Sequence, residues 1–83
     1  MHDPAVIGRL RWRARRGMQE LDRLLARWLD AHADPAHAHR LPDFERLLET
    51  EDDVLWTWMS GRGAPAEPEL QQLVDEIRTD YRS

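Results

Sequence analysis

The chain has 83 residues, of which 41% are hydrophobic, and a formal net charge of −4. This length suits one small domain with a single core, to which four tryptophans can contribute large apolar areas. The absence of cysteine excludes disulfides, thiolate nucleophiles and thiolate metal sites, and is consistent with a reducing compartment. No apolar run approaches the roughly 20 residues that span a bilayer, so we expect neither membrane insertion nor a secretory signal.

Helical periodicity dominates the first half of the chain. Pro4 can occupy the first turn of a helix that starts near Asp3. The apolar stripe of this helix is Val6, Ile7, Leu10 and Ala14. A second helix is predicted from about Gly17. Its stripe is Met18, Leu21, Leu25, Trp28, Leu29 and His32. The next segment, 31–40, combines Asp-Pro with three histidines, which predicts a loop.

The second half predicts three further helices. Pro42 favours a helix start, and the third helix should bury Phe44, Leu47 and Leu48. The acidic run 51–53 favours the start of a fourth helix, which glycine and proline in segment 60–65 should end. That helix contains Leu55, Trp58 and Met59. A fifth helix is expected from about Glu67. Its stripe is Leu70, Leu73, Val74 and Ile77, extended by Tyr81.

The predicted fold class is therefore all-α, a compact bundle of about five short helices in one domain spanning residues 1–83. The residues expected in the core include Phe44, Leu47, Leu48, Trp58, Leu73 and Ile77. Trp12 has two possible placements, against the second helix or exposed beside neighbouring arginines.

The residue types that carry chemistry give little support for catalysis. Ser60 and Ser83 lie in no recognisable nucleophile setting, and no glycine-rich phosphate loop occurs. Asp52 and Asp53 are more typical of a helix N-terminus than of an acid–base pair. The histidines of segment 32–39 match no structural zinc pattern. We therefore expect no enzyme, no catalytic residue and no bound metal.

An unusual run of five arginines precedes the second helix. They are Arg9, Arg11, Arg13, Arg15 and Arg16. Like charges at i, i+4 do not stabilise a helix. A solvated basic face would explain the run without a function, and a surface for nucleic acid would be another explanation. The net charge of −4, together with Glu20 and Asp22, counts against nucleic-acid and membrane surfaces.

The pattern Arg16-Gly17-x-x-Glu20 is more specific than the run of charges. An Arg16–Glu20 ion pair within a helix would contribute only a few tenths of a kcal/mol. Gly17 in a helix interior would cost up to about 1 kcal/mol relative to alanine. Glycine could instead permit close approach of a partner's backbone, or mark the bend between the first two helices. Both explanations can hold at once.

This pattern resembles the Arg-Gly-x-x-Glu hallmark of the SdhE family, the flavinylation or assembly factors of succinate dehydrogenase. The resemblance covers about residues 9–78. Arg9-Leu10-x-Trp12 precedes the hallmark, and a second block follows at comparable spacing: residues 44–49, Asp52, Leu55-x-x-Trp58 and Gly63-x-Pro65. Two departures are visible. The proline that often follows the acidic pair is absent at Val54, and segment 33–40 is histidine-rich.

The resemblance implies a bacterial, cytoplasmic assembly factor with a helical-bundle fold. Its implied partner is the flavoprotein subunit of succinate dehydrogenase or fumarate reductase, whose covalent attachment of FAD to a histidine it promotes. The chemistry would belong to the flavoprotein, and this chain would bind no cofactor stably. We expect the free chain to be a monomer.

The resemblance also suggests how the partner is bound. Gly17 would allow close docking, Arg16 and Glu20 would form charge-assisted hydrogen bonds to the flavoprotein, and Arg9 would extend the contact. Binding would then hold flavin and histidine in position for reaction. The alternative is a nucleic-acid-binding or antitoxin-like regulatory module that uses the arginine run.

Overall fold

Five α-helices and one 3₁₀ helix make up the computed structural model, which describes the backbone of residues 4–82 and the side chains of residues 4–78. In chain order these are α1 (Pro4–Arg13), α2 (Gln19–His32), η1 (Pro35–Arg40, the 3₁₀ helix), α3 (Leu41–Leu48), α4 (Asp52–Met59) and α5 (Pro68–Arg82). No strand occurs in the described part of the chain, which confirms the predicted all-α class. Asp3, Ser83 and the side chain of Tyr81 lie outside the described residues.

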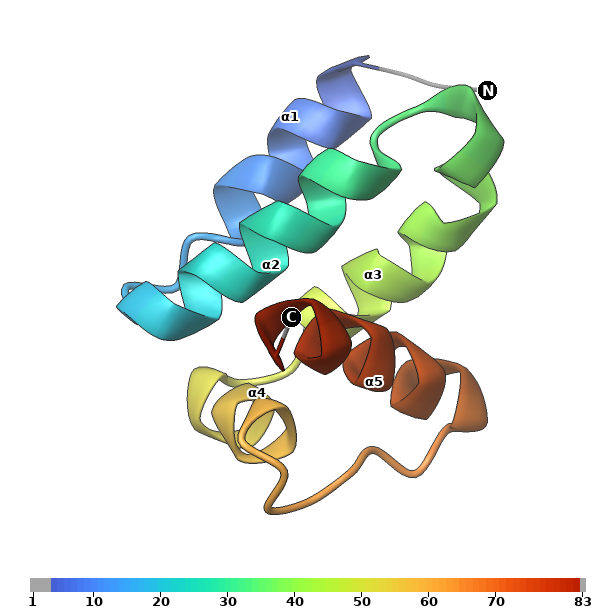
Figure 1. Ribbon diagram of the computed structural model, residues 1–83. Helices are drawn as coiled ribbons and strands as arrows, with labels where there is room; N and C mark the ends of the chain where they lie inside the picture. Colours follow the sequence, from blue (N-terminus) through green and yellow to red (C-terminus); the bar gives the residue numbers. More distant parts are fainter. Residues whose placement is uncertain (1–3, 83) are drawn as a thin grey trace.

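The helices pack around α5 and α2. Figure 1 shows α1 lying alongside α2, with α3 beside them and with α4 and α5 at the other end of the molecule. Helix α5 contacts α2, α3 and α4, while α2 also contacts α1 and η1. The turn between α1 and α2 consequently lies at an outer end of the bundle, where the chain reverses direction (Figure 1).

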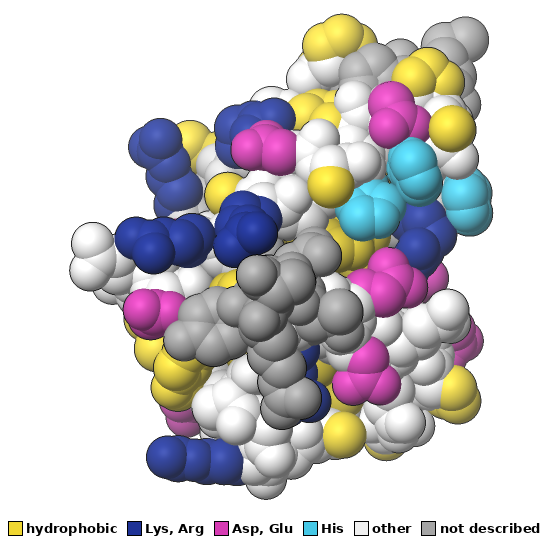
Figure 2. Space-filling view, in the orientation of Figure 1, with side chains coloured by type: hydrophobic (Ala, Val, Ile, Leu, Met, Phe, Trp, Pro, Cys, Tyr) yellow, Lys and Arg dark blue, Asp and Glu magenta, His cyan; other side chains and the backbone are white. Residues whose placement is uncertain are grey.

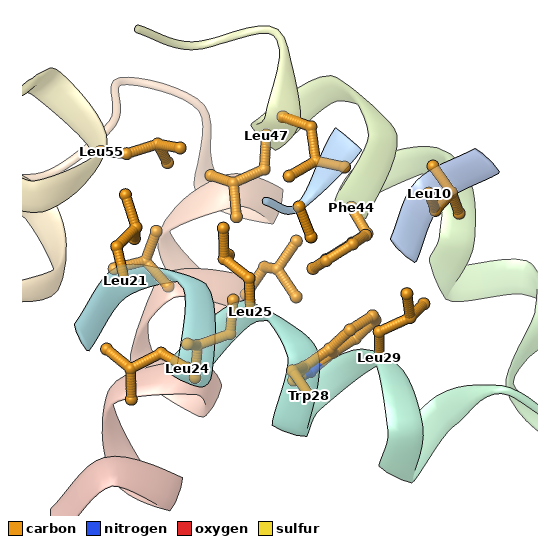
Figure 3. Packing of buried hydrophobic residues seen from close by; sticks show 14 of the residues in the cluster. Leu10, Leu21, Leu24, Leu25, Trp28, Leu29, Phe44, Leu47 and Leu55 are labelled. Atoms are coloured by element: carbon orange, nitrogen blue, oxygen red, sulfur yellow. The ribbon is translucent and has the colours of Figure 1, made fainter. Parts of the chain in front are cut away.

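The core is built from the apolar stripes that the sequence predicted. Its largest fully buried side chains are Trp28, Phe44, Leu10, Leu21, Leu25, Leu29, Leu47, Leu48, Leu55, Leu73 and Ile77. Figure 3 shows side chains of α2 meeting those of α1, α3 and α4 in this cluster. The rings of Trp28 and Phe44 stack with centroids 4.8 Å apart and planes inclined by 11°. Such an aromatic pair adds about 0.5–1.5 kcal/mol beyond the area it buries, and here it joins α2 to α3.

Helix α4 ends as the sequence predicted. Gly61 adopts a φ of +83°, and the amide of Arg62 donates a 2.9 Å hydrogen bond to the carbonyl of Thr57. This is the arrangement of a glycine-terminated helix, in which the left-handed residue lets the chain turn back over the last helical carbonyls. The predicted stop between residues 60 and 65 is therefore confirmed.

Three expectations need correction. Helix α2 begins at Gln19, two residues after the predicted start at Gly17. The segment predicted as a loop contains η1, because Asp34 caps it: the Asp34 carboxylate accepts a 3.0 Å hydrogen bond from the amide of His37. Trp58 is only partly buried and packs against the edge of the core, whereas Leu55 on the same helix is fully buried.

Among the described residues, no helix is long and apolar enough to cross a membrane.

Candidate functional site

The Arg16-Gly17 pair lies in the turn between α1 and α2, outside both helices. Gly17 has a φ of +83°, in the left-handed region that costs other residues roughly 1–2 kcal/mol. A Cβ added at Gly17 would meet no heavy atom within 4 Å. The backbone therefore requires glycine here for its conformation, and the space in front of it is open. The bend between the first two helices, one of the two reasons predicted for a glycine at this position, is present. The open space is compatible with the other reason, close approach of a partner's backbone.

The turn is held in place by Asp22, a residue of α2. One carboxylate oxygen of Asp22 accepts a 2.7 Å hydrogen bond from the amide of Arg16, and the other accepts a 3.1 Å bond from the amide of Gly17. Asp22 thus satisfies two amides that precede the helix and places a negative charge near its positive N-terminal end. Asp22 is not among the site residues predicted from the sequence. The available signal was an acid in the first turns of a helix whose N-cap, Met18, has no side-chain oxygen.

The guanidinium of Arg16 points into the protein. One terminal nitrogen donates to the carbonyl of Leu48 at 2.8 Å and also to the carbonyl of Thr50, and the other donates to the carbonyl of Arg13 at 3.3 Å. Nε lies 2.8 Å from a carboxylate oxygen of Asp52 at an angle outside hydrogen-bond geometry, so this contact is an ion pair. The Arg16 side chain is 15% exposed. It therefore fastens the α1–α2 turn to the segment between α3 and α4.

Glu20 has the opposite environment. It lies in the first turn of α2, is exposed, and its side chain forms no hydrogen bond or ion pair with any described residue. It cannot pair with Arg16 along a helix, because Arg16 lies before the helix begins. The carboxylate of Glu20 is therefore available to a partner, and the weak intrahelical pair considered from the sequence does not form.

A shallow hollow of about 360 Å³ adjoins Glu20. It is lined by Met18, Gln19, Glu20, Leu21 and Trp56. Trp56 comes from α4 and is partly buried against the core. Trp56 is not among the site residues predicted from the sequence, because its position beside the α1–α2 turn depends on how α4 packs and leaves no local signal. This hollow combines an apolar floor with one carboxylate at its edge.

Arg9, the fourth residue predicted to bind a partner, lies on α1 and not in the turn. Its guanidinium is 3.6 Å from a carboxylate oxygen of Glu45, and Arg13 approaches the same oxygen at 3.4 Å. The Arg9 side chain is 58% exposed, so this pair contributes little to stability. The structure thus brings Gly17 and Glu20 to one end of the bundle, turns Arg16 inward, and places Arg9 on the side of α1 that faces α3.

The histidine-rich segment packs onto the core edge. His32 stacks on Trp28 with ring centroids 4.0 Å apart, and a ring nitrogen of His37 lies 2.8 Å and 2.9 Å from the two carboxylate oxygens of Asp34. The hydrogen bond from His37 is the main cause that holds the pKa of Asp34 below its usual value. Within the described residues, no group of three or more such side chains is arranged to hold a metal ion.

Comparisons with known proteins place this site in a family context. The model of a family described as the flavinator of succinate dehydrogenase matches residues 8–81. A protein named FAD assembly factor SdhE from Xylella fastidiosa (strain 9a5c) is 40% identical over 78 residues, which cover 94% of this chain and 80% of that protein. Proteins of the same name from Methylococcus capsulatus and Pasteurella multocida are 41% and 39% identical, each over more than four-fifths of both chains. These names give no support to the nucleic-acid-binding alternative. No solved structure shows a significant match.

Proposed function

The chain belongs to the family of flavinators of succinate dehydrogenase, and from this premise we propose that it is an assembly factor that promotes covalent FAD attachment. Its partner is the flavoprotein subunit of succinate dehydrogenase, with the related subunit of fumarate reductase as a second candidate. The acceptor is a histidine of that subunit. The chain acts in the bacterial cytoplasm as a monomer when free, and it neither catalyses the reaction itself nor binds FAD stably.

The observation that carries this proposal is the geometry of the α1–α2 turn. Gly17 exposes its backbone, with open space where a side chain would project. Glu20 presents a carboxylate that pairs with none of the described residues, beside the hollow floored by Met18 and Trp56. A partner backbone can approach Gly17 closely. The partner can also donate a charge-assisted hydrogen bond to Glu20 and bury one of its apolar side chains in the hollow.

Arg16 and Arg9 keep places in the proposed site with different roles. Because the Arg16 guanidinium is engaged by carbonyls of Leu48 and Thr50, its main contribution is to hold the turn in its binding conformation. Arg9 is exposed and extends the contact along α1. A turn fixed in advance loses less conformational entropy on binding. The contacts of Arg16 with Leu48, Thr50 and Asp52, which we call the Arg16 clamp, therefore favour association without touching the partner.

The contribution to flavinylation is one of positioning. The flavoprotein supplies the histidine and the groups that stabilise charge on the flavin, and the assembly factor holds the flavoprotein in a conformation in which histidine and flavin are adjacent. Fixing two groups in reactive geometry can supply a large part of a reaction barrier without a catalytic side chain from the binding protein.

The substitution Gly17→Arg tests the proposal. The Cβ of the arginine would meet no heavy atom within 4 Å, so the side chain would start in the open space before the turn, where a partner must approach. We expect it to abolish flavoprotein binding and covalent FAD formation. The readout is in-gel flavin fluorescence of the flavoprotein, co-expressed with each variant in a host that lacks its own assembly factor.

Gly17→Ala is the matched control, because it carries the same backbone strain of roughly 1–2 kcal/mol without the bulk. It should retain most activity, and circular dichroism should show both variants to be helical. Covalent flavin that is equal with and without the wild-type chain would contradict the proposed function. An unfolded Gly17→Arg variant would instead show that the fold depends on the left-handed backbone conformation of Gly17.

A further inference from the structure

A second surface of the molecule combines an exposed tryptophan with arginines. Trp12 is 76% exposed, although tryptophan is usually well buried. It lines a hollow of about 190 Å³ together with Gly8, Arg11 and Arg15. We call these four residues the arginine–tryptophan face. The hollow is open at Gly8, because a Cβ added there would meet no heavy atom within 4 Å.

The positive charge on this face is only partly balanced by acidic side chains of the described residues. Of the five arginines between residues 9 and 16, Arg9 and Arg13 pair with Glu45, Arg11 pairs with Asp30, and Arg16 pairs with Asp52. Arg15 is exposed, and its side chain has no acidic partner among the described residues. Arg15 therefore presents a charge that no described acid balances, in a protein whose net charge is −4.

The positive surface continues onto α2. Arg23, Arg27 and Asp30 follow at i, i+4 and i+7, so they lie along one side of the helix. Asp30 pairs with Arg11 of α1, which places this side of α2 next to the arginine–tryptophan face. Arg23 and Arg27 are exposed, and neither forms an ion pair with a described residue. Figure 2 shows dark-blue side chains gathered over α1 and α2.

We propose that the arginine–tryptophan face is a second docking surface, which takes an acidic segment of the same flavoprotein. This inference rests on the proposed function. Arg15 of this face and Met18 of the first hollow flank the Arg16-Gly17 turn, so the two hollows lie on either side of it along the chain. Trp12 buries its indole against the partner, and Arg15, Arg23 and Arg27 face its carboxylates.

The chemistry of the face favours an acidic protein segment over a membrane or nucleic acid. Tryptophan and arginine are the side chains that contribute most at protein interfaces when they become desolvated. Asp30 and Glu20 limit the extent of the positive surface, which suits a short acidic segment better than a continuous polyanion. A single exposed indole also offers no series of stacking sites for successive bases.

Binding of purified flavoprotein, measured by calorimetry at two salt concentrations, tests the proposal. Trp12→Ala and Arg15→Glu should each weaken binding about tenfold or more. Arg15→Glu should also reduce the dependence of affinity on salt, because it removes a charge that faces the partner. Arg62→Glu makes the same charge change at an exposed arginine of the α4–α5 segment and should leave affinity within about twofold, as expected for a charge outside the interface.

Gly8→Gln supplies a variant whose fold is not at risk. Glutamine is a better helix former than glycine, and its side chain would occupy the hollow beside Trp12. We expect weaker flavoprotein binding together with unchanged or higher thermal stability.

The outcomes separate the two proposals. If wild type binds the flavoprotein, Gly17→Arg abolishes binding, and Trp12→Ala, Arg15→Glu and Gly8→Gln all bind as wild type does, the second surface is refuted and the proposed function stands. If wild type does not bind, both fall. Binding of anionic vesicles or duplex DNA at physiological salt that is lost in Arg15→Glu would overturn the assignment of the face to a protein partner.

Discussion

Two adjacent arginines, Arg15 and Arg16, have different roles despite their identical chemistry. Arg16 is turned inward and bonded to the carbonyls of Leu48 and Thr50, residues 32 and 34 positions away in the sequence. Arg15 is exposed and contributes no ion pair with a described residue. Hydrogen bonds that involve a charged donor contribute about 1.5–3 kcal/mol each, and removing the donor leaves its acceptors unsatisfied. Stability should therefore depend on Arg16 far more than on Arg15.

The substitution Arg16→Ala should lower the free energy of unfolding by about 2–4 kcal/mol, because it removes the clamp between the α1–α2 turn and the α3–α4 segment. Urea denaturation followed by circular dichroism measures the change. Arg15→Ala, the neighbouring control, should stay within about 0.5 kcal/mol of wild type. Equal losses for the two variants would show that the Arg16 contacts do not stabilise the fold.

At the scale of elements, the short helix η1 shows how capping determines structure in a segment that resembles a loop. Asp34 accepts hydrogen bonds from the amide and the ring of His37, and the pKa of Asp34 is lowered chiefly by the ring contact. A carboxylate with a depressed pKa stabilises the folded state above its unfolded pKa of about 3.8. That contribution is lost as the pH falls through the lower, folded-state pKa.

Asp34→Asn keeps a capping oxygen and removes the charge. We expect wild type to melt at a higher temperature than this variant at pH 5, and the difference to shrink as the pH falls below about 3.8. Thermal melts across this range measure it. Glu49→Gln is the control, because it replaces an exposed carboxylate that forms no hydrogen bond like that of Asp34 with His37. The difference in melting temperature between this variant and wild type should not shrink in the same way as the pH falls. A difference that stays constant for Asp34→Asn would argue against the Asp34–His37 bond.

At the scale of the whole molecule, α5 joins parts of the chain that are distant in sequence. It contacts α2, α3 and α4, and it contributes Leu73 and Ile77 to the fully buried core. A domain of this length has a free energy of unfolding of roughly 4–12 kcal/mol in total. Losing a single buried side chain of α5 can therefore remove a large part of the stability of every helix at once.

Leu73→Ala should lower the free energy of unfolding by about 2–5 kcal/mol, the range for buried leucines. Far-ultraviolet circular dichroism and tryptophan fluorescence should give coincident urea transitions, because one core links all the helices. Val54→Ala, at a residue that is 38% exposed, should change stability by no more than about 0.5 kcal/mol. Separate transitions would mean that α4 and α5 unfold independently of α1 and α2.

The sequence by itself determined the five α-helices, their apolar faces and the family, but not η1. These features depend on short-range physics, since periodicity places side chains on one face, Pro42 favours the start of α3 and Gly61 ends α4. The hallmark around Gly17 was also visible locally, although its placement two residues before α2 was not.

The tertiary structure alone decided what the marked residues do. Arg16 is internal because its acceptors come from the α3–α4 segment. Trp28 is buried because α2 has neighbours on several sides, whereas Trp12 lies exposed on α1. Trp56 reaches the α1–α2 turn because α4 packs beside it. Each of these facts depends on contacts between residues tens of positions apart. Neither helical periodicity nor local propensity carries that information, so only the packed fold could separate the clamp from the two candidate binding surfaces.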